Sequence, residues 1–169
     1  LQAGVDAALG KRYTLVREVG SGTFSVVWLA KCVSGGDRVA IKIVHASSHP
    51  DRVLREISFL QQLRDSNVPA LLDCGRHEDT YFIVTAYFPH HDFKAFLEVI
   101  PIRLVARYVQ QLLMAVARMH ELGIVHRDIK PRNFLFNLGS GEGRLIDFGL
   151  AQDRSTWEPA VSAREAAKA

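Results

Sequence analysis

The feature that most constrains this chain is the run His126–Asn133, which is followed across a glycine-rich stretch by Asp147-Phe148-Gly149. Asp128, Lys130 and Asn133 bring a carboxylate, an ammonium group and an amide into one short segment. Carboxylate and amide oxygens suit Mg²⁺, and a lysine can neutralise charge on a phosphoryl group. The fold must bring these two segments together, because neither supplies the whole set of groups alone.

A second constraint lies upstream, where a glycine-rich turn, Gly20-Ser21-Gly22, separates two apolar runs and indicates a β-hairpin. Lys42 ends the sequence Val39-Ala40-Ile41-Lys42 in the next apolar run. An ammonium group inside an apolar strand needs an anionic partner. Glu56 is the best candidate, because it lies in the middle of an expected helix, beside the apolar face of that helix.

The pattern of apolar residues predicts an α+β domain. Strands are expected at 13–19, 26–31, 38–44, 71–74 and 81–85, with one helix that begins at Pro50 and another that spans 102–122. A short helix is expected from Asp92 through Glu98. Residues 1–10 carry no clear pattern, and we interpret them as a lead-in segment.

The stretch 102–122 is the strongest helix of the chain. Two neighbouring apolar stripes run along it, Leu104, Tyr108, Leu112 and Val116 in one and Val105, Val109 and Leu113 in the other. An apolar face of this width predicts a core helix that is packed on more than one side. Gly123 is expected to end it.

Composition narrows the class of protein further. The 169 residues are 48% hydrophobic and 23% charged, which is typical of a folded domain. The net charge of +3 comes from scattered Lys and Arg residues, so no direct nucleic-acid site is indicated. Cys32 and Cys74 are isolated, which favours free thiols over a disulfide framework or a zinc site. No apolar stretch reaches the roughly 18 residues that would indicate a membrane span.

These motifs, in this order and at this spacing, resemble those of eukaryotic serine/threonine protein kinases. The resemblance implies a protein-kinase-like fold. An N-lobe and hinge at 11–88 would hold an antiparallel five-stranded sheet with one helix, and 89–152 would form part of a helical C-lobe. Residues 153–169 would begin the activation segment or an insert, and we expect them to be disordered. ATP and Mg²⁺ are the implied cofactors, and a protein is the implied substrate.

The same resemblance assigns a role to each matching residue. Asp128, Lys130, Lys42 and Glu56 would be catalytic, and Asn133 and Asp147 would hold Mg²⁺. The nucleotide would contact Val19, Gly20, Gly22, Ser25, Val27, Ala40, Lys42, Thr85, Tyr87 and Leu135. Thr85 would be the gatekeeper, 86–88 the hinge that binds the adenine edge, and Leu135 the floor beneath adenine. Ser25 stands where the family pattern has a third glycine, and its small side chain should still permit the loop to close.

Several local sequences narrow the resemblance to one type of kinase. The segments 22–27, 48–50, 133–137 and 147–152 are similar to those of the cell-division-cycle DDK type, which licenses the firing of replication origins. This implies a nuclear kinase, or otherwise a cytoplasmic one, that needs an activating regulatory subunit and acts on the replicative helicase. Casein-kinase-1-like enzymes share the sequence Asn133-Phe134-Leu135 and are the alternative, although their glycine loop usually has the third glycine that Ser25 replaces.

The resemblance also implies a C-lobe that continues well past Asp147-Phe148-Gly149. Glu158-Pro159-Ala160 has the wrong order for the Ala-Pro-Glu anchor of the family. We therefore expect a chain that is truncated after this motif. Two further classes stay open: a truncated chain or pseudokinase that binds nucleotide or a regulatory partner without catalysis, and a non-enzymatic module that binds a partner subunit.

This reading predicts that the 169-residue polypeptide alone is marginally stable and transfers phosphate poorly or not at all, because the long helix would expose apolar surface. Phosphorylation of a peptide by the purified chain measures this. Normal turnover by the isolated chain would contradict the prediction.

Overall fold

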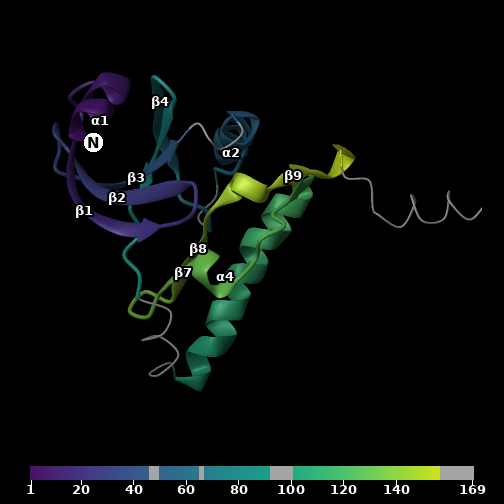
Figure 1. Cartoon of the computed structure of the whole chain (residues 1–169). Helices are drawn as coiled ribbons and strands as arrows, with labels where there is room; N and C mark the ends of the chain where they lie inside the picture. Colours follow the sequence, from purple (N-terminus) through teal and green to yellow (C-terminus); the bar gives the residue numbers. More distant parts are fainter. Residues whose placement is uncertain (46–49, 65–66, 92–100, 157–169) are drawn as a thin grey trace, which may run out of the picture.

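The computed structural model describes residues 1–45, 50–64, 67–91 and 101–156 (Figure 1). Its helices are α1 (Gln2–Leu9), α2 (Pro50–Gln62) and α4 (Ile102–Glu121). Its strands are β1 (Tyr13–Ser21), β2 (Ser25–Cys32), β3 (Arg38–His45), β4 (Leu71–His77), β5 (Thr80–Ala86), β6 (Ile124–Val125), β7 (Phe134–Asn137), β8 (Glu142–Leu145) and β9 (Gln152–Asp153). Three short 3₁₀ turns cover Pro131–Asn133, Phe148–Leu150 and Arg154–Thr156.

The first five strands form one antiparallel sheet in the order β1-β2-β3-β5-β4. All five strands expected from the sequence are present, and the predicted α+β class is confirmed. Beyond the sheet, α4 runs diagonally past the hairpin β7-β8 (Figure 1), and the short strand β6 pairs with β9. This second part of the chain carries both segments of the sequence that most constrain the fold.

The two faces of the sheet are buried in two separate cores. Alternate residues of β3 point to opposite faces, as in any strand. Val39, Ile41 and Ile43 belong to a core that α1 closes through Val5 and Leu9. The other core contains residues of α2, α4 and β6 to β8, so it joins the sheet to the second part of the chain.

Residues 1–10, interpreted from the sequence as a lead-in without a clear pattern, contain a helix, Gln2–Leu9. Val5 and Leu9, four residues apart, are buried with exposures of 0% and 1%. The Gln2 side chain donates to the carbonyl of Tyr13 and accepts from the amide of Leu15, which ties the helix to β1. A helix of this length is marginal alone. Its stability comes from the sheet, so local sequence gave little sign of it.

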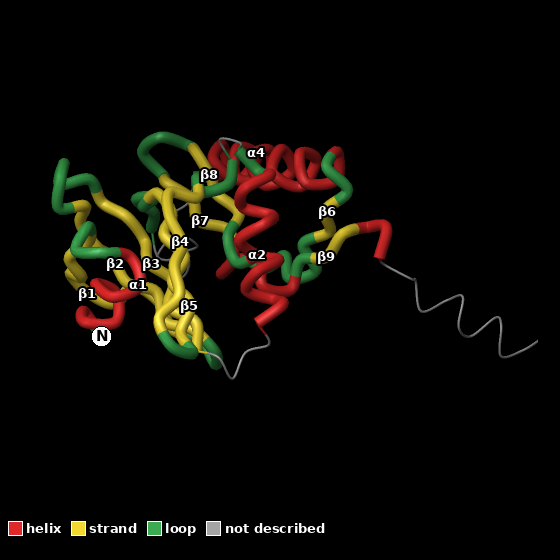
Figure 2. Tube along the Cα trace, turned by 90° about the horizontal axis from the view of Figure 1, so that it is seen from above, coloured by secondary structure: helices red, strands yellow, loops and turns green. Residues whose placement is uncertain are grey.

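Gly75 on β4 permits α1 to lie directly on the sheet. A Cβ atom at this position would lie 2.4 Å from the carbonyl oxygen of Ala8 and 2.9 Å from Leu9 Cδ2. No side chain fits in that space, so glycine is required here by close packing and not by a turn. Figure 2, viewed from above, shows α1 against the sheet on the side away from α2.

Helix α4 is confirmed over nearly all of its predicted length; it ends at Glu121, and Gly123, two residues later, has φ 72°. Gln111, Ala115 and Met119 form its buried line. The expectation of packing on more than one side does not hold for the described residues, since the stripe Val105, Val109 and Leu113 is exposed.

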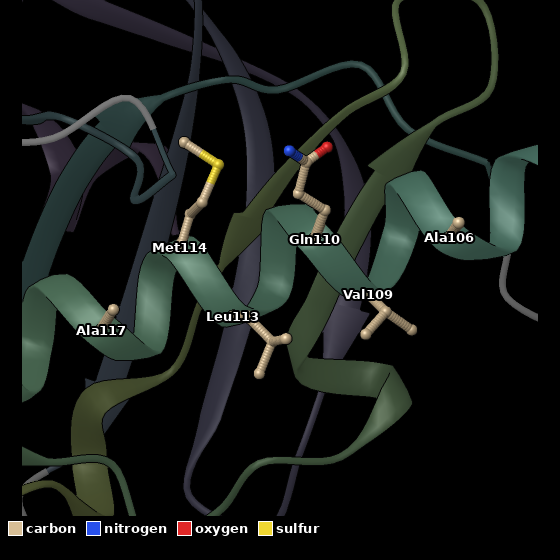
Figure 3. A pocket seen from close by; sticks show the side chains of 6 residues that line it. All are labelled: Ala106, Val109, Gln110, Leu113, Met114 and Ala117. Carbon is tan, nitrogen blue, oxygen red and sulfur yellow. The ribbon is translucent and has the colours of Figure 1, made fainter.

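A shallow, open apolar depression of about 670 Å³ lies along this exposed side of α4. Figure 3 shows Met114 and Gln110 on one edge of the helix and Leu113 and Val109 on the other. The described part of the chain contains no helix long and apolar enough to cross a membrane.

Some expectations fall on residues that the structure does not describe. They are the helix from Asp92 through Glu98, the segment 48–50 apart from Pro50, and the segment Glu158-Pro159-Ala160. The disorder expected for 153–169 likewise concerns mostly such residues, although 153–156 form the end of β9 and one 3₁₀ turn.

Replacing Gly75 with alanine is expected to lower the free energy of unfolding by about 1–3 kcal/mol, the usual cost of overpacking. The new methyl group would push α1 off β4, since it overlaps the backbone of Ala8. Urea denaturation measures the change. Gly35→Ala is the matched control, because a Cβ there would meet only Asp37 Oδ2 at 3.6 Å. Equal stability of the two variants would contradict the packing described for α1.

Candidate active site

The sheet presents one face to the second part of the chain. Val27 lies opposite Lys42 in the register of β2 and β3, and Ala40 lies opposite Thr85 in that of β3 and β5. Residues paired across antiparallel strands share a face, and so do residues two apart along a strand. These four predicted nucleotide contacts therefore share the face opposite the one that α1 covers.

Lys42 lies at the centre of this face and pairs with two carboxylates. Its Nζ donates to Glu56 Oε1 at 2.8 Å, to Glu56 Oε2 at 2.9 Å and to Asp147 Oδ1 at 2.8 Å. The ion pair expected between Lys42 and Glu56 is thus present, and it includes Asp147 as well. One ammonium group joins β3, α2 and the segment after β8.

The position of Glu56 follows from the register of α2. Val53, Glu56, Phe59 and Leu60 are the buried residues of that helix, at spacings of three and four. The carboxylate therefore points into the core with the apolar side chains, and Lys42 meets it there. Removing Lys42 would leave the buried Glu56 carboxylate without its ammonium partner, and such a loss costs about 3–5 kcal/mol in typical buried pairs.

Burial and charge set the protonation of the three groups. Burial alone would lower the pKa of Lys42, but the carboxylates of Glu56 and Asp147 outweigh it and raise that pKa. Burial would raise the pKa of Asp147, but Lys42 overrides it and the pKa is lowered. For Glu56 burial prevails, and the pKa is raised although Lys42 opposes the shift. Two carboxylates share one ammonium group, which leaves the site with an excess of negative charge when both are ionised.

The backbone around these groups adopts an uncommon conformation at two places. Asp147 has φ 66° and Arg127, directly before Asp128, has φ 68°. Residues with a side chain rarely occupy this region, and they do so mostly where the surrounding structure holds them for a function.

Asp128 is held by two residues of its own loop. Lys130 Nζ donates to Asp128 Oδ2 at 2.7 Å, and Asn133 Nδ2 donates to the same oxygen at 2.9 Å. Asn133 Nδ2 also donates to the backbone carbonyl of Asp128 at 2.9 Å. The amide of Asn133 is thereby oriented with its nitrogen toward Asp128, so its oxygen is the atom that remains for a metal ion.

His126 ties this loop to the segment that carries Asp147. The backbone N–H of Asp128 donates to Nδ1 at 3.3 Å, so the other ring nitrogen, Nε2, is the one that donates to the carbonyl of Ile146 at 3.1 Å. The ring packs edge-on against Phe148 with centroids 5.1 Å apart. Burial lowers the pKa of His126, which favours this neutral form. The sequence-based view of His126 as a packing and hydrogen-bonding residue agrees with these contacts.

The glycine-rich turn is closed by a hydrogen bond from the amide of Gly22 to the carbonyl of Ser25 at 2.8 Å. Neither Gly20 nor Gly22 has a positive φ. A Cβ at either position would meet its nearest described neighbour at 3.9 Å, which is ordinary contact. The fold itself does not require these two glycines, so their lack of a side chain is available for a ligand that approaches the backbone.

The remaining predicted nucleotide contacts lie on three other segments. Val19 lies at a bulge of β1, where the register shifts between Glu18 and Gly20. Tyr87 follows the end of β5, and Leu135 lies in β7 opposite Arg144. The roles assigned to these residues from the sequence stay predictions.

A buried pair of amides was missed by the sequence analysis. Asn67 Nδ2 donates to Gln111 Oε1 at 2.8 Å and to the carbonyl of Gly143 at 3.3 Å, and the amide of Leu145 donates to the carbonyl of Asn67 at 2.8 Å. The segment after α2 is thus bonded to α4 and to β8, the strand that leads to Asp147. The one available signal was Gln111, a polar residue beside the apolar stripes of the long helix.

Comparison with known proteins agrees with this geometry. Residues 13–164 match the family model of the protein kinase domain. The chain belongs to the protein kinase family. The match covers both parts of the structure, from the start of β1 to beyond the Asp147-Phe148-Gly149 motif, and leaves α1 outside it.

Curated relatives confirm the resemblance to cell-division-cycle kinases. The chain is 44% identical over 142 residues to the probable cell division control protein 7 homolog 2 of Encephalitozoon cuniculi, covering 83% of this chain and 40% of the relative. It is 33% identical over 177 residues to the cell cycle serine/threonine-protein kinase hsk1 of Schizosaccharomyces pombe, covering 85% and 35%. It is 36% identical over 164 residues to the human cell division cycle 7-related protein kinase, covering 89% and 29%. The matched part is therefore two fifths or less of each of these relatives.

Protein kinases use ATP and Mg²⁺, and the residues present fit both. No group of three or more His, Cys, Asp or Glu side chains gathers in the described ranges. Mg²⁺ does not need such a cage, because it binds one or two protein oxygens together with water and nucleotide phosphates. Asn133 and Asp147 would supply these oxygens, and the bound ion would neutralise phosphate charge. The excess negative charge beside Lys42 suits a cation.

Replacing Gln111 with leucine is expected to lower the free energy of unfolding by about 1–3 kcal/mol, because the buried amide of Asn67 would lose Gln111 Oε1 as an acceptor. Thermal or urea denaturation measures the loss. The adjacent Gln110 is exposed and provides the matched control as Gln110→Leu. If the two variants unfolded at the same urea concentration, the hydrogen bond between Asn67 and Gln111 would make no net contribution to stability.

Proposed function

We propose that this chain is the ATP-binding and catalytic part of a protein kinase that transfers the γ-phosphoryl group of ATP to serine or threonine of protein substrates. The observation that carries the proposal is the hydrogen-bonded group of Lys42, Glu56 and Asp147, together with the loop of Asp128, which His126 ties to the segment that carries Asp147. Each group has the chemistry that phosphoryl transfer requires. Kinase family membership supports the same reading.

Lys42 would contact the nucleotide phosphates, and Glu56 would hold its ammonium group in position. The neighbouring carboxylate of Asp147 and the amide oxygen of Asn133 would hold Mg²⁺. Val27, Ala40 and Thr85 would line the base site above, with Leu135 below and the backbone of the hinge at its edge. The phosphates would be covered by the glycine-rich turn and its neighbours, Val19, Gly20, Gly22 and Ser25. Tyr87 would belong to the hinge.

Asp128 would orient the substrate hydroxyl and accept its proton as the oxygen attacks phosphorus. Lys130 and Asn133 both contact Oδ2, and no described residue donates to Oδ1. That second oxygen is therefore free for the hydroxyl of a serine or threonine. Lys130 would also neutralise charge on the phosphoryl group during transfer.

We further propose a cell-cycle role of the DDK type: activation by a regulatory subunit, action on the replicative helicase at the initiation of DNA replication, and location in the nucleus. Support comes from identities of 33–44% to cell-division-cycle kinases over most of this chain. Phosphorylation of helicase subunits by the whole protein, with and without the regulatory subunit, tests this role. A rate that does not depend on the subunit would contradict it.

In the whole protein, Asp128→Asn is expected to reduce kcat for phosphoryl transfer by about 10²–10⁴-fold, the usual contribution of a general base. The KM for ATP should change little, because Asp128 lies on the loop that faces the substrate hydroxyl. Transfer of labelled phosphate from ATP to a serine-containing protein measures both constants. Asp37→Asn, in the exposed turn before β3, is the control. Undiminished transfer by Asp128→Asn would exclude the proposed role.

A further inference from the structure

The segment that follows β5 carries two consecutive aromatic residues, and each lies against a guanidinium group. The Arg38 guanidinium carbon is 5.9 Å from the centroid of the Tyr87 ring. The Arg144 guanidinium carbon is 4.6 Å from the centroid of the Phe88 ring. Both distances lie within the range of cation–π attraction.

The two arginines come from opposite sides of this segment. Arg38 begins β3 in the five-stranded sheet, and its carbonyl accepts a hydrogen bond from the amide of Tyr87 at 3.3 Å. Arg144 belongs to β8, in the second part of the chain. The connection between the two parts is therefore held from both ends.

The hairpin β7-β8 also holds the residues after Phe88. Asn137 Nδ2 donates to the carbonyl of Pro89 at 2.9 Å, and the amide of His91 donates to the carbonyl of Phe136 at 3.2 Å. The amide of Leu138 donates to His91 Nδ1 at 3.3 Å. The segment 87–91 thus runs along the hairpin with polar contacts at two successive places.

Asn137 is suited to this position because its side chain serves two purposes. Its Oδ1 accepts from the amides of Gly139 and Ser140 at 2.9 and 3.0 Å, which shapes the turn of the hairpin. Its Nδ2 remains free to donate to Pro89. An aspartate would keep the first set of bonds and lose the second.

The same face of the hairpin carries Leu135. Leu135 and Arg144 are directly opposite in the register of β7 and β8, so both side chains lie on one face, while Phe134 and Phe136 point into the core. The contact of Arg144 with Phe88 therefore fixes the distance between the hinge and the predicted floor of the base site.

We propose that Arg144 and Asn137, with Arg38 on the other side, are positioning residues that hold the hinge 86–88 and the residues 89–91 after it, an arrangement we call the clasp, and thereby pre-form the site for the base of the nucleotide. This inference rests on the proposed function, which assigns the hinge and Leu135 to nucleotide binding. A hinge fixed before binding loses less freedom when the base enters, so the affinity for the base is higher.

The clasp predicts different effects on binding of the base and on binding of the phosphates. Arg144→Met, which keeps the carbon stem, and Asn137→Asp are each expected to weaken binding of ATP, ADP and adenosine by the same factor, about threefold to fivefold, as for one partly exposed cation–π contact or hydrogen bond. Titration calorimetry measures the three affinities. Lys42→Met should weaken ATP and ADP but not adenosine, and Arg118→Met on the exposed side of α4 should weaken none.

Hydrogen exchange of the hinge amides supplies a readout that needs no nucleotide. In the free protein, the amides of Tyr87 and His91, which are hydrogen-bonded to Arg38 and Phe136, should exchange about tenfold faster in Arg144→Met and Asn137→Asp than in the wild type. Amides of β3 should keep their rates, which shows that the variants are folded.

The two readouts distinguish failure of the clasp from failure of the proposed function. Unchanged affinities in both variants, or a loss confined to ligands with phosphates, would overturn the clasp while the kinase reading stands. If the wild type bound neither ATP nor adenosine, the proposed function would fall. The hydrogen-exchange rates of the hinge amides would then test the clasp by themselves. Faster exchange in the variants would support the clasp as a connection between the two parts of the chain. Unchanged exchange rates would overturn it.

Discussion

One partly buried ammonium group connects the sheet, helix α2 and the second part of the chain. Lys42 lies in a strand whose other residues are apolar, and its charge is tolerated there only because Glu56 and Asp147 meet it. Those two carboxylates come from α2 and from the segment after β8. Satisfying a single charge therefore fixes the position of a helix on the sheet and of the second part of the chain beneath it. The same constraint places the catalytic groups, so stability and chemistry share one set of contacts.

Much of the fold could be predicted from the sequence because its signals are local. The five strands show alternating or continuous apolar runs bounded by turn residues, and α4 ends two residues before Gly123, which adopts a positive φ. The catalytic loop of the candidate site could be predicted for the same reason. Asp128, Lys130 and Asn133 lie within one loop, and both other residues contact Asp128 there. The pair of Lys42 and Glu56 could also be predicted. A positive charge in an apolar strand and a negative charge beside an apolar helix face each need a partner of opposite charge.

The features that the sequence did not predict are those that depend on distant partners. Helix α1 is too short to be stable alone, and Gly75, the residue that makes room for it, lies in a different element. The contacts of Arg38 and Arg144 with the hinge depend on the register of two separate hairpins. The local sequence around an arginine does not indicate that it will contact an aromatic ring in a distant segment. Gln111 and Asn67 lie in separate segments, and only their burial in the fold shows that they form a pair.

The packing of α1 on β4 has a consequence for the order in which the chain folds. Gln2–Leu9 leaves the ribosome before the sheet strands that follow it, yet the surface that stabilises this helix includes Gly75 and is complete only when β4 and β5 have been synthesised. Until then the apolar side chains of Val5 and Leu9 have no site to enter. Helix α1 is therefore among the last elements of the sheet region to fold, and it covers the outer face after the strands have paired.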